Sequence, residues 1–491
     1  MSTSVIINTL VAYVALLFLV AHRSTRGMKS RVETFLTGGR STHRVVAAIA
    51  MVGAAMSGVT YISVPGTVLN DGFSYLQTCL GFLVGYIIIA YVLIPLYYRL
   101  GVVSLYEYLD RRFGITAHRT GAWLFFISKI LSASLRAYVI CMVLQGLLYD
   151  RYDTPLWVNA LVMMSLVWLY TRRGGVRSVV WVETLKTVLM VGSIVTCIVY
   201  VISALDMGVG EAVSTIAHSD YSQVLYLDDP LDRRYFWKQF LAGIFLVVAM
   251  TGLDQDMMQT SLSCLTMRDA QRSMISSIFV QIAVITLFLG LGALLYTFVE
   301  SRGLEVTHGD ELFGYVAIEC GLPVVVGVMF LLGLVASTYS SAGSALTALT
   351  VSFTLDILHA QRHYDVHTDE GEAAFERLRR RTHLLIAVVM TLVIVAFGRW
   401  SSSGVINLIF TMAGYTYGPL LGLFAFGLLC RRSVRSGAIP VIALLCPIVC
   451  YVVAENSEQW FGGYQFSYEL LILNAALTML CLWVCSKRCA H

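Results

Sequence analysis

Long stretches without charged side chains recur from one end of this sequence to the other, and they limit what the chain can fold into. Of its 491 residues, 57% are hydrophobic and 13% are Asp, Glu, Lys or Arg, about half of the roughly 25% charged residues typical of soluble domains. A soluble fold of this length would need a larger charged surface. We therefore expect an all-α, polytopic membrane protein and exclude an ordinary cytosolic enzyme.

The apolar stretches predict about thirteen transmembrane segments, because a helix needs about 20 apolar residues to cross a bilayer. No other stretch is long and polar enough to form a soluble domain, so we expect residues 1–491 to form one membrane domain. The expected segments are 4–22, 44–69, 74–98, 118–149, 155–171, 178–205, 236–264, 273–299, 318–357, 382–398, 402–428, 436–454 and 467–486.

The charged residues that flank these segments predict their orientation. No positive residue precedes the first apolar run, whereas Arg23, Arg26, Lys29 and Arg31 follow it. This pattern indicates an anchored helix with its N-terminus outside, not a cleaved signal peptide. An odd number of crossings then makes the C-terminus cytoplasmic, and most Lys and Arg residues fall in cytoplasmic loops of a cell-membrane protein. The net charge of +4 leaves no basic face for nucleic acid.

Two of the segments contain residues that interrupt a helix. The second contains Gly53-Ala54-Ala55-Met56-Ser57-Gly58, and the seventh contains Thr251-Gly252 followed by Asp254-Gln255-Asp256. The two segments are five crossings apart, so they cross the membrane in opposite directions. Broken helices at matching places of two inverted five-helix units indicate a secondary transporter. The alternative is that the glycines only allow helices to pack closely.

The ninth segment is rich in hydroxyl groups. Leu334, Ser337, Thr338 and Ser341 follow one another at helical spacing, so they share one face. Hydroxyls inside a helix can bond back to a carbonyl of the preceding turn, which is a purely structural explanation. Together with carbonyls freed at a helix break, however, they would supply the several oxygen ligands that Na⁺ requires.

Arg136 lies near the middle of the fourth segment. An uncompensated charge at that depth costs at least about 3 kcal/mol. Two explanations remain open: an ion pair with Glu183, Asp254 or Asp256, or binding of a carboxylate of the substrate by the planar guanidinium. Lys129, seven residues earlier on nearly the same face, is interpreted as structural.

With these features, the sequence resembles the sodium/solute symporter family, which includes sodium-coupled sugar, proline, pantothenate and sialic acid carriers. The resemblance extends over essentially the whole chain. It rests on Phe35-Leu36-Thr37-Gly38-Gly39-Arg40, Met56-Ser57-Gly58, Pro65-Gly66, Gly174-Gly175-Val176, Trp181-Val182-Glu183, Ser337-Thr338 and Tyr415-Thr416-Tyr417-Gly418-Pro419-Leu420-Leu421-Gly422.

The resemblance implies a leucine-transporter-type core of two inverted repeats, 44–205 and 236–428, with peripheral helices at 4–22 and within 436–486. It implies Na⁺ as the coupling ion. The main sodium site would consist of Gly53, Met56, Leu334, Ser337 and Thr338. A second sodium site, found in some members, would consist of Glu183, Ser340 and Ser341, with Glu183 in place of the family's aspartate.

The expected substrate-binding residues are Ser57, Thr60, Gln77, Arg136, Met250 and Asp254. Sugar carriers of the family usually have a tyrosine where this chain has Met250, which argues against a glucose- or galactose-like site. Ser57 and Thr60 resemble the hydroxyl pair of the sialic acid branch.

We therefore expect a sodium-coupled symporter that imports a small polar solute by alternating access: a sugar acid such as sialic acid, or a sugar. The other possibilities are a sodium-coupled amino acid or vitamin carrier, a transporter-like sensor or a passive channel. We expect no enzymatic activity, because no buried Ser/His or paired-Asp arrangement of an intramembrane hydrolase is evident. The expected partners are the solute, sodium ions and the lipid bilayer, with the monomer as the functional unit.

Overall fold

The computed structural model describes residues 2–26, 31–101, 104–304, 306, 308–365, 368–400 and 405–488. Each of the expected segments corresponds to a helix or to consecutive helices. The long or broken spans are α1 (Thr3–Thr25), α3 (Arg44–Ala55) with α4 (Gly58–Asp71), α5 (Tyr75–Ile88) with η2 (Ile89–Leu93) and α6 (Ile94–Leu100), α8 (Ile115–Leu144) with η3 (Gln145–Tyr149), α9 (Leu156–Gly174), α10 (Val176–Ala204), α12 (Phe236–Val247) with η6 (Val248–Gly252) and α13 (Gln255–Leu262), α14 (Met267–Ser301), α16 (Val324–Ser352) with η7 (Phe353–Ile357), α18 (Asp369–Trp400), α19 (Val405–Leu429), α20 (Ala438–Glu455) and α22 (Leu470–Val484).

Short elements connect these spans. They are α2 (Arg31–Thr37), η1 (Gly38–Arg40), α7 (Glu107–Phe113), η4 (Asp150–Tyr152), α11 (Val209–Ala217), η5 (Asp220–Ser222), α15 (Gly309–Ile318), α17 (Ala360–His363), β1 (Arg432–Val434), α21 (Ser457–Trp460) and β2 (Ser486–Arg488).

By length and composition, nine helices within the described ranges can cross a membrane, and each of two bent helix pairs adds one more span. The other two expected segments are α9, which has 19 residues and two arginines in its last turn, and α22, which has 15 residues. The last expected segment differs at its end. Ser486 belongs to β2, which pairs antiparallel with β1, so the final helix stops at Val484.

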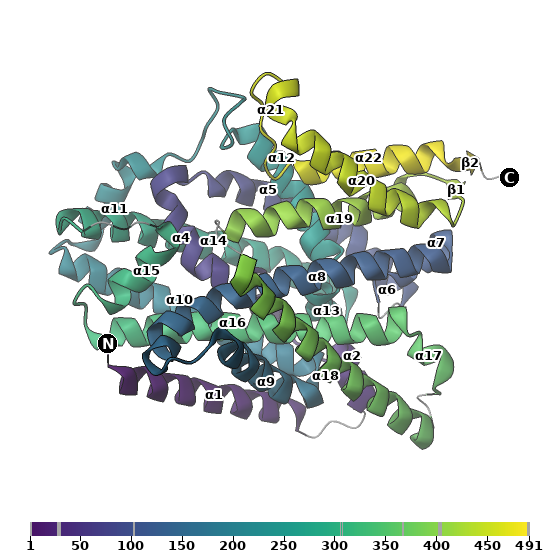
Figure 1. Cartoon of the computed structure of the whole chain (residues 1–491), viewed down its shortest axis with the longest axis horizontal. Helices are drawn as coiled ribbons and strands as arrows, with labels where there is room; N and C mark the ends of the chain where they lie inside the picture. Colours follow the sequence, from purple (N-terminus) through teal and green to yellow (C-terminus); the bar gives the residue numbers. More distant parts are fainter. Residues whose placement is uncertain are drawn as a thin grey trace.

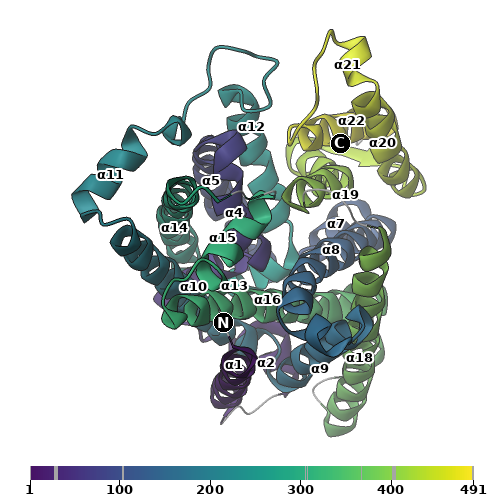
Figure 2. The same cartoon turned by 60° about the vertical axis from the view of Figure 1, so that its left-hand side comes forward.

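The long helices form one bundle. In Figure 1, α8, α16 and α19 run along the long axis, and the two termini lie at opposite ends of the bundle, as an odd number of crossings requires. α11 and α15 lie at the end that holds the N-terminus, whereas α7 and α17 lie at the other. Figure 2 shows α16 near the middle, α1 on one side and α20 with α22 on another. α16 packs against α10 and α8, and α22 packs against α19.

Both predicted helix interruptions are present. α3 and α4 meet at an angle of 62°, and the pair formed by α12 with η6 and α13 meets at 69°. At the first break Met56 and Ser57 are extended, and α4 begins at Gly58. At the second, a π-helical turn ends at Gly252, and Asp254 caps α13 by accepting a hydrogen bond from the Asp256 backbone N–H. Local π-helical turns inside α-helices are frequent at functional sites.

Close packing, the alternative explanation for the glycines, also applies. A Cβ on Gly53 would lie 2.6 Å from the carbonyl oxygen of Glu183 and 2.6 Å from Thr187 Oγ1 on α10. Thr187 Oγ1 also donates a hydrogen bond of 2.9 Å to the Ile49 carbonyl. The end of α3 is therefore held tightly against α10, and the break is a defined feature of the fold.

Candidate substrate cavity and cation sites

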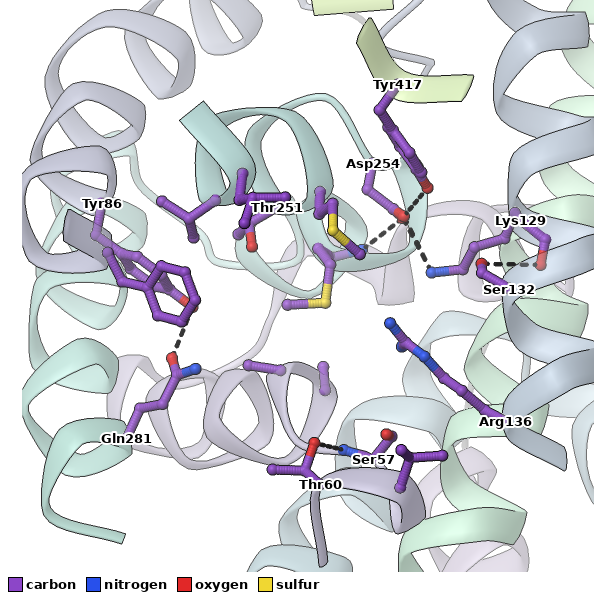
Figure 3. Close-up of a pocket in the computed structure, with 18 of the residues that line it drawn as sticks. Ser57, Thr60, Tyr86, Lys129, Ser132, Arg136, Thr251, Asp254, Gln281 and Tyr417 are labelled. Carbon is purple, nitrogen blue, oxygen red and sulfur yellow. Dashed lines mark hydrogen bonds and ion pairs between the residues drawn. The ribbon is translucent and has the colours of Figure 1, made fainter. Parts of the chain in front are cut away.

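A cavity of about 110 Å³ lies between the two helix breaks (Figure 3). Its volume is several times what one water molecule needs. Side chains from the end of α3, from α4, α5, α8, α14 and α19, and from both sides of the second break line it. Its polar lining residues are Ser57, Thr60, Tyr75, Tyr86, Lys129, Ser132, Arg136, Thr251, Asp254, Gln281 and Tyr417.

Lys129 forms ion pairs with both aspartates of the second break. Its Nζ lies 3.1 Å from Asp254 Oδ2 and 2.7 Å from Asp256 Oδ2, and all three side chains are buried. Tyr417 donates a hydrogen bond of 2.6 Å to Asp254 Oδ2, and Ser344 donates one of 3.3 Å to Asp256 Oδ2. These contacts join α8, α13, α16 and α19. The interpretation of Lys129 as a structural residue agrees with this geometry.

Asp254 lines the cavity as expected, but its carboxylate is already satisfied by the protein. Oδ1 accepts the backbone N–H of Asp256 at 2.9 Å, and both oxygens contact Lys129. With the hydroxyl of Tyr417 on Oδ2, the carboxylate has donors from three helices. We infer that Asp254 holds the break in shape and shapes the cavity wall.

Arg136 reaches into the same cavity without a carboxylate partner. Figure 3 shows its guanidinium between the Lys129–Asp254 pair and Ser57. Its Nε is buried and has no hydrogen-bond partner, and within the described ranges the guanidinium makes no ion pair. The ion pair with Glu183, Asp254 or Asp256 considered above is not formed, because Lys129 and Lys186 pair with those carboxylates.

Three other expected binding residues, Ser57, Thr60 and Met250, also lie in the cavity lining. Ser57 precedes the first turn of α4, and its backbone N–H donates to Thr60 Oγ1 at 3.3 Å. Both hydroxyl-bearing side chains therefore face the cavity from one short turn (Figure 3).

Gln77 is placed elsewhere. Its Nε2 donates to the Arg234 carbonyl at 2.8 Å, and its Oε1 accepts from the Tyr226 backbone N–H at 3.1 Å. The amide therefore fastens the loop before α12 to α5, and Gln77 is absent from the described lining of the cavity.

Three residues that line the cavity, Tyr86, Gln281 and Tyr417, were not expected there from the sequence. Tyr86 donates a hydrogen bond of 3.0 Å to Gln281 Oε1 across the lining, opposite Lys129 (Figure 3). Gln281 is a polar residue inside an otherwise apolar stretch of α14, and this signal alone pointed to it. Tyr417 belongs to the motif used for the family resemblance, but the motif does not reveal its contact with Asp254.

Of the residues expected for the main sodium site, Thr338 lies where α16 faces the first break. A Cβ on Gly58 would lie 2.8 Å from Thr338 Oγ1, so this hydroxyl contacts the start of α4. Ser337 and Thr338 both donate to the Leu334 carbonyl, at 2.8 and 2.9 Å. The structural explanation for these hydroxyls therefore holds, yet each oxygen keeps two lone pairs after donating its proton.

The α3 side of this site consists of backbone carbonyls at the end of a helix, where the supply of intrahelical N–H donors ends. Met56 is extended, and its backbone N–H turns back to the Gly53 and Val52 carbonyls at 3.1 and 3.2 Å. The Met56 carbonyl follows the last turn of α3, two residues before Gly58. Thr338 Oγ1 on α16 therefore lies beside the break at which the carbonyls of α3 end, and oxygens of these two kinds are the ligands that a hard monovalent cation requires.

The residues expected for a second sodium site also come together, but a lysine lies among them. Lys186 Nζ is 3.1 Å from Glu183 Oε2 and donates a hydrogen bond of 2.9 Å to Ser341 Oγ. Ser340 Oγ is buried nearby on α16 without a hydrogen bond. The spacing of Glu183 and Lys186, three residues apart on one helix, was a signal for this pair.

The chain matches one family over most of its length. The sequence model of the sodium:solute symporter family matches residues 35–444. The sodium/iodide cotransporter of Homo sapiens is 23% identical over 418 residues, which cover 82% of this chain and 62% of the relative. Sodium-coupled monocarboxylate transporter 1 of Xenopus laevis is 26% identical over 416 residues, covering 82% and 64%. The chain thus spans a little over three fifths of the length of these curated relatives.

Among solved structures, a substrate-bound, outward-open Na⁺-coupled sialic acid symporter aligns with 99% of this chain and 99% of its own. The TM-score is 0.81 and the sequence identity is 18%. At this identity the likeness is informative about the fold alone. It confirms the predicted class, an all-α multi-pass membrane protein with a transporter-type core.

Proposed function

Because the chain belongs to the sodium:solute symporter family, we propose that it is a sodium-coupled symporter for a small organic anion bound through a carboxylate. The observation that carries this proposal is the position of the Arg136 guanidinium. It lies in the cavity, and its buried Nε–H donates a hydrogen bond to no described group. A planar guanidinium binds a carboxylate with two parallel hydrogen bonds, so an organic acid would satisfy it.

The charges around the cavity also favour an anion. Lys129 and Arg136 contribute two positive charges, and Asp254 and Asp256 contribute two negative charges. The four groups therefore sum to zero before ions bind, and Na⁺ beside the cavity adds one positive charge. A monoanionic substrate restores neutrality, whereas a neutral sugar would leave an uncompensated charge in a low-dielectric region, which is costly.

The names of the relatives agree with an anionic substrate. Iodide and monocarboxylates are anions, and the related solved structure is that of a sialic acid carrier. Arg136 and the Ser57–Thr60 turn would bind the carboxylate and a neighbouring hydroxyl of such an acid. A sugar acid such as sialic acid and a smaller hydroxy or keto acid both fit this description.

Sodium coupling follows from the position of the proposed ion site. An ion held by the Met56 carbonyl and by the hydroxyls of Ser337 and Thr338 would tie the broken α3–α4 helix to α16. The same break carries Ser57 and Thr60, which line the cavity. If the ion raises the affinity for the substrate by some factor, the substrate raises the affinity for the ion by the same factor. One Na⁺ moving down a potential of 100 mV supplies about 2.3 kcal/mol, and its concentration gradient adds to this.

We also propose that the protein resides in the cell membrane with its N-terminus outside, and that the monomer transports. The positive residues after α1 support this orientation, and the opposite placement of the two ends agrees with it.

A thermal-stability screen of the purified protein tests this proposal. Each acid is paired with a neutral counterpart: lactate with propane-1,2-diol, and sialic acid with N-acetylmannosamine, each in NaCl and in KCl. We expect at least one acid to raise the melting temperature in NaCl and its neutral counterpart to have no effect. If Na⁺ has no effect with any compound, sodium coupling is wrong. If only neutral compounds stabilise the protein in NaCl, the role given to Arg136 is wrong.

A further inference from the structure

Lys186 and Glu183 form a buried ion pair that neither the cavity nor the main sodium site uses. Both side chains have zero exposure, and their charged atoms are 3.1 Å apart on α10. The ammonium also donates a 2.9 Å hydrogen bond to Ser341 Oγ on α16. It therefore sits between a carboxylate and a hydroxyl from two different helices, which is the environment of a bound cation.

We propose that the Lys186 ammonium permanently occupies a cation site formed by Glu183 and Ser341, so that the transporter binds a single sodium ion per cycle. The oxygens around Nζ are the types that bind Na⁺, and the ammonium carries the same single charge. This inference rests on the proposed sodium symport and specifies its stoichiometry.

Two physical reasons exclude a sodium ion while Lys186 is present. Its charge already balances the Glu183 carboxylate, so the site has no net negative charge to attract a second cation. A Na⁺ ion bound to the same oxygens would also lie within a few ångströms of the ammonium, and two like charges that close repel strongly where water is excluded. The lysine is attached to the chain, so its occupancy does not depend on ion concentration.

Unused oxygens show that the site could accept an ion if the lysine were removed. Glu183 Oε1 and Ser340 Oγ are buried and have no hydrogen-bond partner among the described groups. With Glu183 Oε2 and Ser341 Oγ they would provide four oxygens around one position. The absent Cβ of Gly53 would lie 2.9 Å from Glu183 Oε2, so the end of α3 contacts this carboxylate directly.

Counting bound sodium tests the proposal without knowledge of the substrate. Purified protein is titrated with radioactive sodium, and the number of ions bound per chain at saturation is measured. We expect one ion for the unmodified protein and two for Lys186→Met, which leaves Glu183 without its cation. The double variant Lys186→Met with Glu183→Gln, which removes both charges, should bind one ion again. Lys238→Met, a buried lysine in another part of the bundle that contacts the Leu231 carbonyl, is the matched control and should bind one.

Each outcome separates this inference from the proposed function. Two ions bound by the unmodified protein would overturn the inference and leave sodium symport intact. No sodium bound by the unmodified protein would overturn sodium symport itself. Lys186→Met that is folded, as judged by a cooperative melting transition, and still binds one ion would overturn the inference. If Lys186→Met does not survive purification, Lys186→Gln, which also removes the ammonium charge, is counted in its place with the same two outcomes.

Discussion

Replacing Arg136 with methionine separates a substrate-binding arginine from a structural one. Methionine keeps much of the side-chain length but removes the charge and all donors. In the structure no described carboxylate pairs with Arg136, and its Nε has no partner. The substitution therefore breaks no described ion pair, although it leaves Lys129 alone to balance Asp254 and Asp256. We expect the stability without substrate to fall by much less than in a variant that loses an ion-pair partner.

The affinity for the substrate should fall much more than the stability. Hydrogen bonds to charged groups contribute about 1.5–3 kcal/mol, and 1.4 kcal/mol corresponds to a factor of ten in affinity. Losing the guanidinium should therefore weaken binding of the acid by about 10- to 150-fold. Binding of Na⁺ in the absence of the acid should not weaken, because Arg136 contributes no ligand to the proposed sodium site and its removal takes away a like charge.

Lys129→Met is the informative comparison, because Lys129 lies about two helical turns earlier on nearly the same face of α8 and carries the same charge. It is the ion-pair partner of both Asp254 and Asp256, and removing one partner of a buried pair costs about 3–5 kcal/mol. This variant should therefore melt at a clearly lower temperature or fail to express.

The measurements are melting curves of both variants without substrate and equilibrium binding of the acid selected by the stability screen. If Arg136→Met destabilises the protein as much as Lys129→Met while acid affinity is unchanged, Arg136 is structural and the proposed substrate class loses its main support.

Three further changes test the sites individually. Thr338→Val keeps the shape of the side chain but removes an oxygen ligand. Because one hydrogen bond or contact with a charged group contributes about 1.5 kcal/mol or more, the Na⁺ concentration for half-maximal uptake should rise about tenfold. An unchanged sodium dependence of uptake in proteoliposomes would contradict the ion site. Gly58→Ala places a Cβ 2.8 Å from both Thr338 Oγ1 and Ile140 Cδ1. Because such overpacking costs about 1–3 kcal/mol, both the melting temperature and its increase with NaCl should fall. If NaCl raises the melting temperature of the variant as much as that of the unmodified protein, the break and α16 are not linked through this contact. Tyr417→Phe removes the 2.6 Å hydrogen bond to Asp254. Melting curves should show a loss of stability of about 1–3 kcal/mol, and a sodium titration should show unchanged sodium binding. Unaltered stability would mean that the carboxylate does not need the tyrosine in addition to Lys129.

The sequence alone determined the membrane class, the positions of the spans and the places where two of them break. These properties are local: hydropathy over about 20 residues identifies a span, and the Gly53–Gly58 and Thr251–Asp254 stretches contain the residues that end helices. The shared face of Ser337 and Thr338 likewise follows from helical spacing, and the structure places that face at the first break.

Only the tertiary structure determined which buried charged side chains form ion pairs with one another. Lys129 and Arg136 lie on nearly the same face of α8. Their spacing does not indicate which of them forms an ion pair with Asp254, which follows Lys129 by 125 residues in the sequence. Rotation and tilt of packed helices set that contact to within an ångström, and hydropathy is insensitive to both. For the same reason the contact of Lys186 with Ser341, and of Gln77 with the loop before α12, emerged from packing. The local pattern thus specified the helices, and the packing between them assigned each buried charge its partner.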